Sequence, residues 1–321
     1  MEIFFDPLGL DEPPRGSVLS IGNFDGVHIG HQAVLRHVVS RGAELRTTAM
    51  ALTLEPHPVK LLRPNEAPRL VTTLAQRLQL IERTGIAATL VVPFTRTFAR
   101  SSAEAFVRDV LVARLAAQEV YIGANFRFGA DRGGDVDLLR KMGRELGFTA
   151  ASAPTVKLAG EVVSTTRVRR ALTEGRVGEA AGLLGRFTFV DGEVAVGKRL
   201  GSELGFPTLN LDWENELVPK QGVYITAVHI PSFRRTFPSV TNIGVRPTVY
   251  ENSAVTMESH LLDFTADVYR ERVRLFFLER LRDEQHFTTT TQLMAQIRRD
   301  VTAARTWWST HAVESLDLVL L

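Results

Sequence analysis

The glycine-rich stretch SVLSIGNFDGVHIGH, residues 17–31, joins a short apolar run to the start of a helical pattern. The run 17–21 predicts a buried strand, and the helical pattern extends to about Val39. In an open parallel sheet, ligands bind beyond the carboxyl ends of the strands, where this turn falls. Glycines at 22, 26 and 30 allow a close backbone approach, and a helix N-terminus attracts anions. The stretch therefore predicts a phosphate site, although its spacing matches neither a dinucleotide fingerprint nor a Walker loop.

Strand-like and helical segments alternate through the rest of the first half. Strands are expected at 47–54, 87–94 and 119–123, and helices at 74–85, 101–117 and 134–147. This alternation implies a mostly parallel sheet covered on both faces. From Phe187 to about Phe277 the segments are short and strand-like, and one helical segment follows at 289–308. We therefore predict an α/β Rossmann-like domain over 1–185 and a mostly antiparallel β-barrel domain with a C-terminal helix over 186–321, with a sandwich as the alternative to the barrel.

The composition is that of an ordinary globular protein of about two domains, with 321 residues, 45% of them hydrophobic and 23% charged. Lysine plus arginine exceed aspartate plus glutamate by 38 − 36 = 2, and no basic run suggests nucleic acid as a partner. The absence of cysteine excludes disulfides, thiolate catalysis and cysteine-ligated zinc, and is compatible with a reducing cytoplasm. No apolar run is long enough to span a membrane, and the first residues lack the pattern of a secretion signal. We expect a cytoplasmic protein without a membrane partner; the sequence leaves the oligomeric state open.

Two histidines at the start of the predicted first helix carry the chemistry of the turn. His28 and His31 are three residues apart, so both imidazoles can donate hydrogen bonds to one phosphate. Attack on an α-phosphorus builds negative charge on the phosphate oxygens, which positioned donors stabilise. Two structural histidines, or a pair of zinc ligands, are the alternatives, and His-x-x-His without cysteine is weak evidence for metal.

The letters HIGH (28–31) resemble the HxGH signature of the nucleotidyltransferase superfamily, which class I aminoacyl-tRNA synthetases share. Those synthetases also carry a KMSKS-like loop, but the nearest string here, KMGRE (141–145), lies inside a predicted helix. The chain also lacks room for a tRNA-binding domain beside the β module. The resemblance therefore implies nucleotidyl transfer, with both histidines catalytic and ATP bound by Gly22, Asn23, Phe24, Asp25 and Gly26.

A second motif lies at the end of the first half. VVSTTRVR (162–169) closely resembles the ISSTxxR motif of the same superfamily, with Thr165 in place of the second serine. By resemblance, Ser164 and Thr165 bind ATP, and Arg169 is catalytic and holds the leaving pyrophosphate. A plain helix cap followed by solvated arginines is the alternative.

Two further strings resemble bacterial FAD synthetases, the bifunctional riboflavin kinase/FMN adenylyltransferases. IGANFRFG (122–129) is similar to their G-x-[ND]-F-x-F-G stretch, and TLEPHP (53–58) to their TFxPHP, with Leu54 at the usual phenylalanine. A leucine there weakens any stacking on flavin, and the phenylalanines of the first string are alternatively plain core residues. The resemblance implies a flavin site made of Pro56, His57, Asn125, Phe126 and Phe128.

In the second half, GRFTFVDGEVAVGKRLGSELGFPTLNLD (185–212) resembles the riboflavin kinase module and contains its PTxN motif. Thr208 and Asn210 alternate with apolar residues, so on a strand they face the same side. Neutral oxygens there suit Mg²⁺, which takes its remaining ligands from water and ATP phosphates. A pair of ordinary β-turns is the alternative. The implied site for ATP and Mg²⁺ comprises Lys198, Gly201, Gly205, Pro207, Thr208 and Asn210.

NIGVRPTV (242–249) and MESHLLDF (257–264) are similar to two more motifs of the kinase module. Phosphoryl transfer to an alcohol calls for a base near the hydroxyl, and Glu258 is a carboxylate within an apolar-alternating strand. By resemblance Glu258 is that base, and Asn242 and Arg246 belong to the flavin-site loop. A glutamate on the polar face of a half-exposed strand is the alternative. His260 is expected to be structural.

The resemblance runs from about Ser20 to Asp300 and implies two reactions on one chain. The C-terminal domain would phosphorylate riboflavin to FMN with MgATP, and the N-terminal domain would adenylylate FMN to FAD with release of pyrophosphate. An adenylyltransferase whose β domain only binds flavin remains an alternative, as does a nucleotide-binding regulator without turnover. Thr208, Asn210 and Glu258 argue against the first alternative, and the histidine pair against the second.

Overall fold

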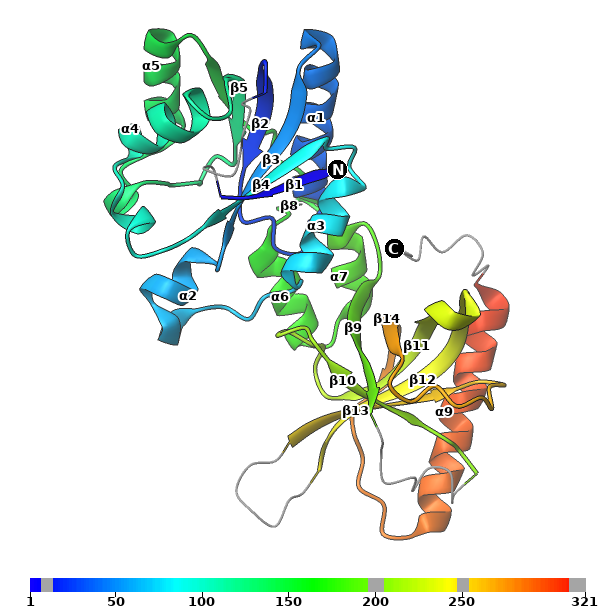
Figure 1. The fold of residues 1–321 in the computed structure, drawn as a ribbon. Coiled ribbons are helices and arrows are strands. Elements are labelled where there is room, and N and C mark those ends of the chain that lie inside the picture. Colours follow the sequence, from blue (N-terminus) through cyan, green and yellow to red (C-terminus); the bar gives the residue numbers. More distant parts are fainter. Residues whose placement is uncertain (7–13, 196–204, 247–253, 312–321) are drawn as a thin grey trace. The chain divides into compact units, whose positions relative to one another are not determined.

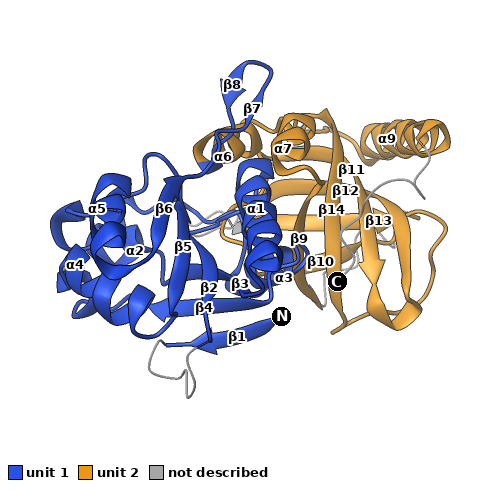
Figure 2. Cartoon of the chain, turned by 90° about the horizontal axis from the view of Figure 1, so that it is seen from above, with its two compact units in different colours: residues 1–165 blue, residues 166–321 orange. Residues whose placement is uncertain are grey.

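The chain forms two compact units in the computed structural model, which describes residues 1–6, 14–195, 205–246 and 254–311. The units are Met1–Thr165 and Thr166–Leu321, and Figure 2 colours them separately. The predicted domain boundary after residue 185 stays a prediction. Among the described residues, no helix is both long enough and apolar enough to cross a membrane.

The first unit is built on a six-stranded sheet in the order β1-β4-β3-β2-β5-β6, and all of its strand pairs are parallel (Figure 1). Its strands are β1 Glu2–Phe5, β2 Ser17–Ile21, β3 Thr48–Glu55, β4 Ala88–Pro93, β5 Ala117–Ile122 and β6 Thr149–Ser152, with a separate hairpin of β7 Lys157–Leu158 and β8 Glu161–Val162. Its α-helices are α1 Ile29–Leu45, α2 Pro58–Leu62, α3 Leu74–Glu82, α4 Ala103–Phe106 and α5 Val136–Leu146. Shorter helical turns are η2 Pro64–Glu66, η3 Phe98–Arg100, η4 Val107–Val112 and η5 Ala130–Arg132.

Helices cover both faces of this sheet because its central strands are apolar on both sides. One face buries Leu19 and Leu52 against α4, η4 and α5 in a continuous core. The other face packs on α1, where a Cβ added to Gly42 would lie 3.1 Å from Cβ of Ala49 and 3.2 Å from the carbonyl oxygen of Thr47. A larger residue at position 42 would therefore push its neighbours apart by a few tenths of an ångström. The helix α1 begins at Ile29, after the turn that follows the carboxyl end of β2, where the phosphate site is expected.

The second unit is a closed antiparallel barrel in the order β10-β13-β12-β11-β14-β9, and β9 pairs with β10 to close it. Its strands are β9 Thr188–Ala195, β10 Leu209–Trp213, β11 Gly222–Ile230, β12 Arg235–Arg246, β13 Ala254–Leu261 and β14 Arg272–Arg282, with a helical turn η6 at Pro231–Phe233. Its helices are α6 Thr165–Thr173, whose first residue belongs to the first unit, α7 Val177–Leu184 and α9 Thr290–Thr310. The backbone N–H of Lys220 donates to the carbonyl of Leu172, which ties α6 to the barrel.

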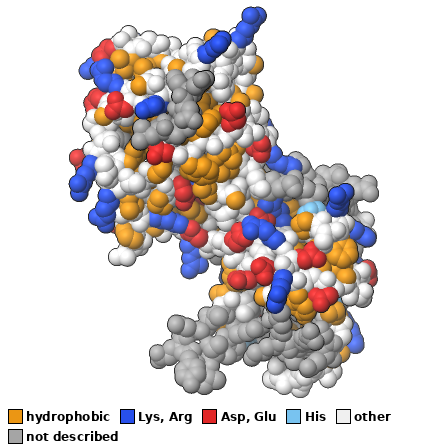
Figure 3. Space-filling view, in the orientation of Figure 1, with side chains coloured by type: hydrophobic (Ala, Val, Ile, Leu, Met, Phe, Trp, Pro, Cys, Tyr) orange, Lys and Arg blue, Asp and Glu red, His pale blue; other side chains and the backbone are white. Residues whose placement is uncertain are grey.

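The predicted fold class is confirmed: a parallel α/β sheet is followed by an antiparallel barrel and a C-terminal helix. The expected helix 101–117 is shorter than predicted, because α4 ends at Phe106 and continues as the π-helical turn η4. On the face that Figure 3 shows, basic and acidic side chains are interspersed over both units.

Candidate active sites

The two histidines of the HIGH motif stack on each other at the start of α1. Their ring centroids are 3.6 Å apart and their planes differ by 16°. His28 is the N-cap of α1, and its Nδ1 accepts a hydrogen bond of 3.2 Å from the backbone N–H of His31. Because Nδ1 accepts, Nε2 of His28 carries a hydrogen and is the nitrogen that can donate to a ligand.

His31 is half-buried, and its ring is held neutral. Burial, and then the electrostatic interaction with neighbouring His28, lower the pKa of the His31 imidazole well below its usual value. Its Nδ1 is buried and has no hydrogen-bond partner among the residues that the structure describes. The ring of Phe24 contacts it edge-on, with centroids 5.3 Å apart. A buried ring nitrogen without a partner is uncommon in folded proteins, and it marks His31 as a candidate functional residue.

The lowered pKa predicts an acid sensitivity of the first unit. Unfolded His31 takes up a proton near pH ~6.5, and folded His31 does so only at lower pH. The unfolded state therefore binds more protons between the two pKa values, and stability falls there by up to ~1.4 kcal/mol per pH unit as the pH decreases. Amide hydrogen exchange in α1 at pH 7.0 and 5.5 should show this loss in the wild type and a smaller loss in His31→Gln. Equal losses in the two proteins would contradict it.

The ISSTxxR-like segment meets the glycine-rich turn that contains the HIGH motif. The hydroxyl of Thr165 donates to the carbonyl oxygen of Asp25 at 3.3 Å. A Cβ added to Gly30 would lie 3.1 Å from the ring of His28 and 3.9 Å from the carbonyl oxygen of Val163. The structure therefore brings together two motifs that were expected in one site. Arg169 lies one helical turn after Thr165 on α6, within the second unit, and its approach to the histidines stays a prediction.

A cavity of about 470 Å³ opens beside the glycine-rich turn in the first unit. His57, Asn125, Phe126 and Phe128 line it, as the flavin interpretation expects, together with Asn23 and Leu54. Pro56 is not among the lining residues, and Pro58 takes its place. The Glu55–Pro56 peptide bond is cis.

The two phenylalanines at this cavity differ in their surroundings. Phe128 is only 9% exposed and packs on Phe106 in the core, with ring centroids 5.5 Å apart. Phe126 is half-buried and lies roughly parallel to Phe128, with centroids 6.3 Å apart. The alternative interpretation as core residues thus fits Phe128, and Phe126 is the ring with more surface left for a ligand.

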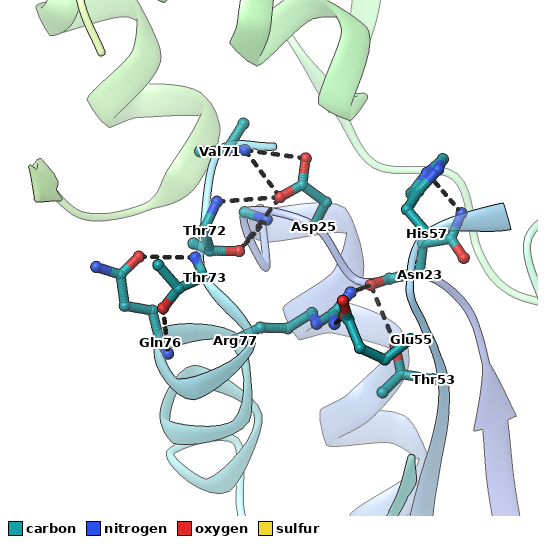
Figure 4. Close-up of polar contacts among 11 residues, drawn as sticks. Asn23, Asp25, Thr53, Glu55, His57, Val71, Thr72, Thr73, Gln76 and Arg77 are labelled. Atoms are coloured by element: carbon teal, nitrogen blue, oxygen red, sulfur yellow. Dashed lines mark hydrogen bonds and ion pairs between the residues drawn. The ribbon is translucent and has the colours of Figure 1, made fainter. Parts of the chain in front are cut away.

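Asp25 and Asn23 hold the glycine-rich loop, residues 22–27, to its neighbours (Figure 4). The carboxylate of Asp25, 3% exposed, accepts hydrogen bonds of 3.0 and 3.1 Å from the backbone N–H groups of Val71 and Thr72. Asn23 Nδ2 lies 3.0 Å from Nε2 of His57. These contacts hold the carboxylate of Asp25 to the segment before α3, and its expected part in binding ATP stays a prediction. Its observed contacts are those of a residue that shapes the loop.

The barrel holds a second cavity, of about 270 Å³, lined by Thr208, Asn242 and Glu258. In the strand ladder Glu258 of β13 lies directly opposite Asn210 of β10 on one side and Asn242 of β12 on the other. Side chains of directly paired residues point to the same face, about 5 Å apart. Three motifs from distant parts of the sequence therefore converge on Glu258.

Nearby contacts fix the shape of this second cavity. His260 Nδ1 is 2.8 Å from the carbonyl oxygen of Pro207, so it donates to the PTxN segment, in keeping with the structural role expected for it. Arg282 of β14 donates to the carboxylate of Asp300 of α9 at 2.7 Å, which docks that helix against the cavity. Gly205 is exposed and has a φ of +79°, which glycine tolerates, and Pro207 is also exposed. Lys198, Gly201 and the side chain of Arg246 lie outside the described residues.

Two family models and several curated relatives match this chain. Residues 10–167 match the model for FAD synthetase, and residues 184–308 match the model for riboflavin kinase. The bifunctional riboflavin kinase/FMN adenylyltransferase of Escherichia coli (strain K12) is 38% identical over 293 residues, covering 91% of this chain and 93% of the relative. The protein of the same name from Pseudomonas fluorescens is 40% identical over 291 residues, covering 91% and 93%.

The chain belongs to the bifunctional riboflavin kinase/FMN adenylyltransferase family. A solved structure also resembles it over nearly its whole length. This is a crystal structure described as a macrolide-efflux protein from Streptococcus pneumoniae, with a TM-score of 0.85 and 25% identity, covering 96% of this chain and 100% of the other.

Sequence reasoning missed several residues that line the first cavity. They come from a short helix, loops and turns whose letters carry no periodic pattern, and none falls in a motif. Two of them, Arg63 and Arg132, place positive charge at the cavity, and charge in a loop was the one available signal. The missed residues include Leu62, Arg63, Phe98, Ser101, Asp131 and Arg132.

Proposed function

We propose that this chain makes FAD from riboflavin in two steps, at one site in each unit. The second unit transfers a phosphoryl group from ATP to riboflavin and gives FMN. The first unit then transfers AMP from a second ATP to FMN and gives FAD and pyrophosphate. The observation that carries the proposal is that each unit has a cavity lined by residues of several distant motifs of the family.

In the kinase step, the ribityl 5′-hydroxyl of riboflavin attacks the γ-phosphorus of ATP. The bond from that phosphorus to the bridging oxygen breaks, and ADP leaves with the bonding electrons. The carboxylate of Glu258 takes the proton of the attacking hydroxyl. Its support for this role is its position between Asn210 and Asn242 on the face that lines the cavity. Asn242 and Arg246 would belong to the flavin side, and Lys198, Gly201 and Gly205 to the ATP side.

The proposed kinase step uses Mg²⁺ with ATP. Thr208 and Asn210 offer neutral oxygens, which suit this ion. The described residues contain no group of three or more His, Cys, Asp or Glu side chains that could hold a metal. A donor set of this kind fits an ion that completes its coordination with water and ATP phosphates. When bound, Mg²⁺ neutralises charge on the transferred phosphate.

In the adenylyl transfer, a phosphate oxygen of FMN attacks the α-phosphorus of ATP. The bond to the bridging oxygen of the β-phosphate breaks, and pyrophosphate leaves. The FMN phosphate is already an anion, so no protein nucleophile is needed. His28 Nε2–H and His31 donate to the oxygens that gain charge, Ser164 and Thr165 bind phosphate, and Arg169 holds the leaving pyrophosphate.

The chemistry also sets the expected partners and location. Riboflavin, FMN, FAD and ATP are the small-molecule partners, and the net charge of +2 gives no support for nucleic acid or a membrane. The absence of cysteine supports the cytoplasm as the compartment.

Incubation with riboflavin, ATP and Mg²⁺, followed by chromatography of the flavins, tests the proposal. We expect FMN first and FAD later, and chelation of Mg²⁺ should stop both. FAD made from supplied FMN but no FMN made from riboflavin would instead favour an adenylyltransferase whose barrel only binds flavin. Binding of ATP without any product would favour a regulator.

A further inference from the structure

A buried arginine in the first unit joins two loops that line its site. Arg77 of α3 is 1% exposed, and Figure 4 shows its guanidinium pointing toward Asn23 and Glu55. Its Nη1 donates to the carbonyl oxygen of Asn23 at 2.9 Å, and its Nη2 forms an ion pair with the carboxylate of Glu55. One planar side chain thus holds two acceptors from different parts of the sheet.

The two acceptors belong to the two halves of the proposed reaction. Asn23 lies in the loop that leads to His28 and the expected ATP site. Glu55 is the last residue of β3, and His57, two residues later, lines the cavity expected to take the flavin. The hydroxyl of Thr53 adds a second donor to the Asn23 carbonyl at 3.2 Å. Arg77 therefore links two loops directly. We call them the nucleotide loop, which is the glycine-rich loop 22–27, and the flavin loop, residues 55–58.

The arginine itself sits on a firmly anchored helix start. Thr73 and Gln76 form a reciprocal capping box at the N-terminus of α3, with hydrogen bonds of 3.0 and 3.2 Å. Just before it, the backbone N–H groups of Val71 and Thr72 donate to Asp25 of the nucleotide loop. The loop is thus held to α3 at Asp25 and at Asn23, so its position relative to Arg77 is fixed.

We propose that Arg77 is a positioning residue for adenylyl transfer, one that sets the placement of the nucleotide loop relative to the flavin loop. The inference rests on the proposed function. An in-line transfer needs the attacking oxygen and the α-phosphorus aligned about 3–3.5 Å apart, and a misplacement of about 1 Å can lower the rate ~10²-fold. A buried ion pair adds little to the stability of a fold, because apolar residues of similar volume in its place often stabilise the protein at least equally. The fork of arginine holds two acceptors in a fixed plane, which the single ammonium of lysine does not.

Steady-state kinetics of the conversion of FMN to FAD by Arg77→Met and Arg77→Lys test this role. We expect kcat to fall ~10- to 10²-fold in both variants, with the KM values of ATP and FMN changed less than about threefold. Phosphorylation of riboflavin by the same chain should be unchanged. Arg41→Met is the matched control, because it removes an arginine that pairs with Glu119 in the same unit, and it should keep the wild-type kcat.

Thr53→Val provides a test that leaves the ion pair in place. It removes only the second donor to the Asn23 carbonyl, and we expect a kcat loss of about threefold or more with FMN still bound. The proposal would be overturned if kcat were unchanged in both Thr53→Val and a folded Arg77→Met. It would also be overturned if Arg77→Met lost no more kcat than Arg41→Met, or if only the KM values of Arg77→Met changed. A wild-type protein that forms no FAD would instead overturn the proposed function itself.

Discussion

Replacing His28 with alanine is expected to lower the rate of FMN adenylylation by ~10²- to 10³-fold, because the variant loses a positioned donor to the phosphate that gains charge. Nε2 of His28 is the nitrogen that carries the hydrogen, since Nδ1 accepts from the backbone of His31. The kinase step takes place in the other unit and should continue, so FMN accumulates from riboflavin. Chromatography of the flavins against time measures both rates in one experiment.

His28→Asn separates the catalytic loss from a loss of helix stability. His28 caps α1, and removal of a cap typically costs about 1 kcal/mol. Asparagine is a good N-cap but lacks the imidazole. We therefore expect His28→Asn to be as stable as the wild type and nearly as slow as His28→Ala. If His28→Asn restored the wild-type rate, the imidazole would have no part in the chemistry.

Replacing Glu258 with glutamine is expected to lower riboflavin phosphorylation by ~10²- to 10⁴-fold, the usual cost of losing a general base. Glutamine keeps the shape of the side chain between Asn210 and Asn242 but cannot accept the proton. Supplied FMN should still become FAD at the wild-type rate. The measurement is FMN formed from riboflavin and FAD formed from FMN, assayed separately.

Glu279→Gln is the matched control for Glu258→Gln. Glu279 is an exposed carboxylate on β14 of the same barrel and does not line the second cavity. The Glu279→Gln variant should phosphorylate riboflavin at the wild-type rate. A kinase rate in Glu258→Gln within threefold of this control would mean that another group acts as the base.

The sequence predicted the elements whose patterns are strong and continuous. The apolar run 17–21 became β2 with the expected bounds, and 47–54 became β3 shifted by one residue. Both are central strands buried on both faces. Because such strands are apolar at successive positions, an unbroken apolar run in the sequence indicates them. The strand β1, Glu2–Phe5, was not predicted, because an edge strand of four residues carries too little pattern.

The missed part of the first site depends on contacts made only in the fold. In LAQRLQL, Arg77 looks like an ordinary arginine of a helix, and nothing local shows that it is buried against Asn23. Asp25 looks like a ligand of the glycine-rich turn, although its carboxylate binds a segment 46 residues away. In the barrel, by contrast, strand alternation predicts that Thr208 and Asn210 share a face, although Thr208 lies just before β10. Only the ladder shows that Glu258 lies opposite Asn210.

The central claim is that two separate sites on one chain act in sequence. Equal amounts of His28→Ala and Glu258→Gln, mixed with riboflavin, ATP and Mg²⁺, test it most directly. Each variant alone should fail to make FAD from riboflavin, because the first stops at FMN and the second leaves riboflavin unchanged. The mixture should make FAD, since FMN released by the first protein is adenylylated by the second. A mixture that forms no FAD would contradict the account.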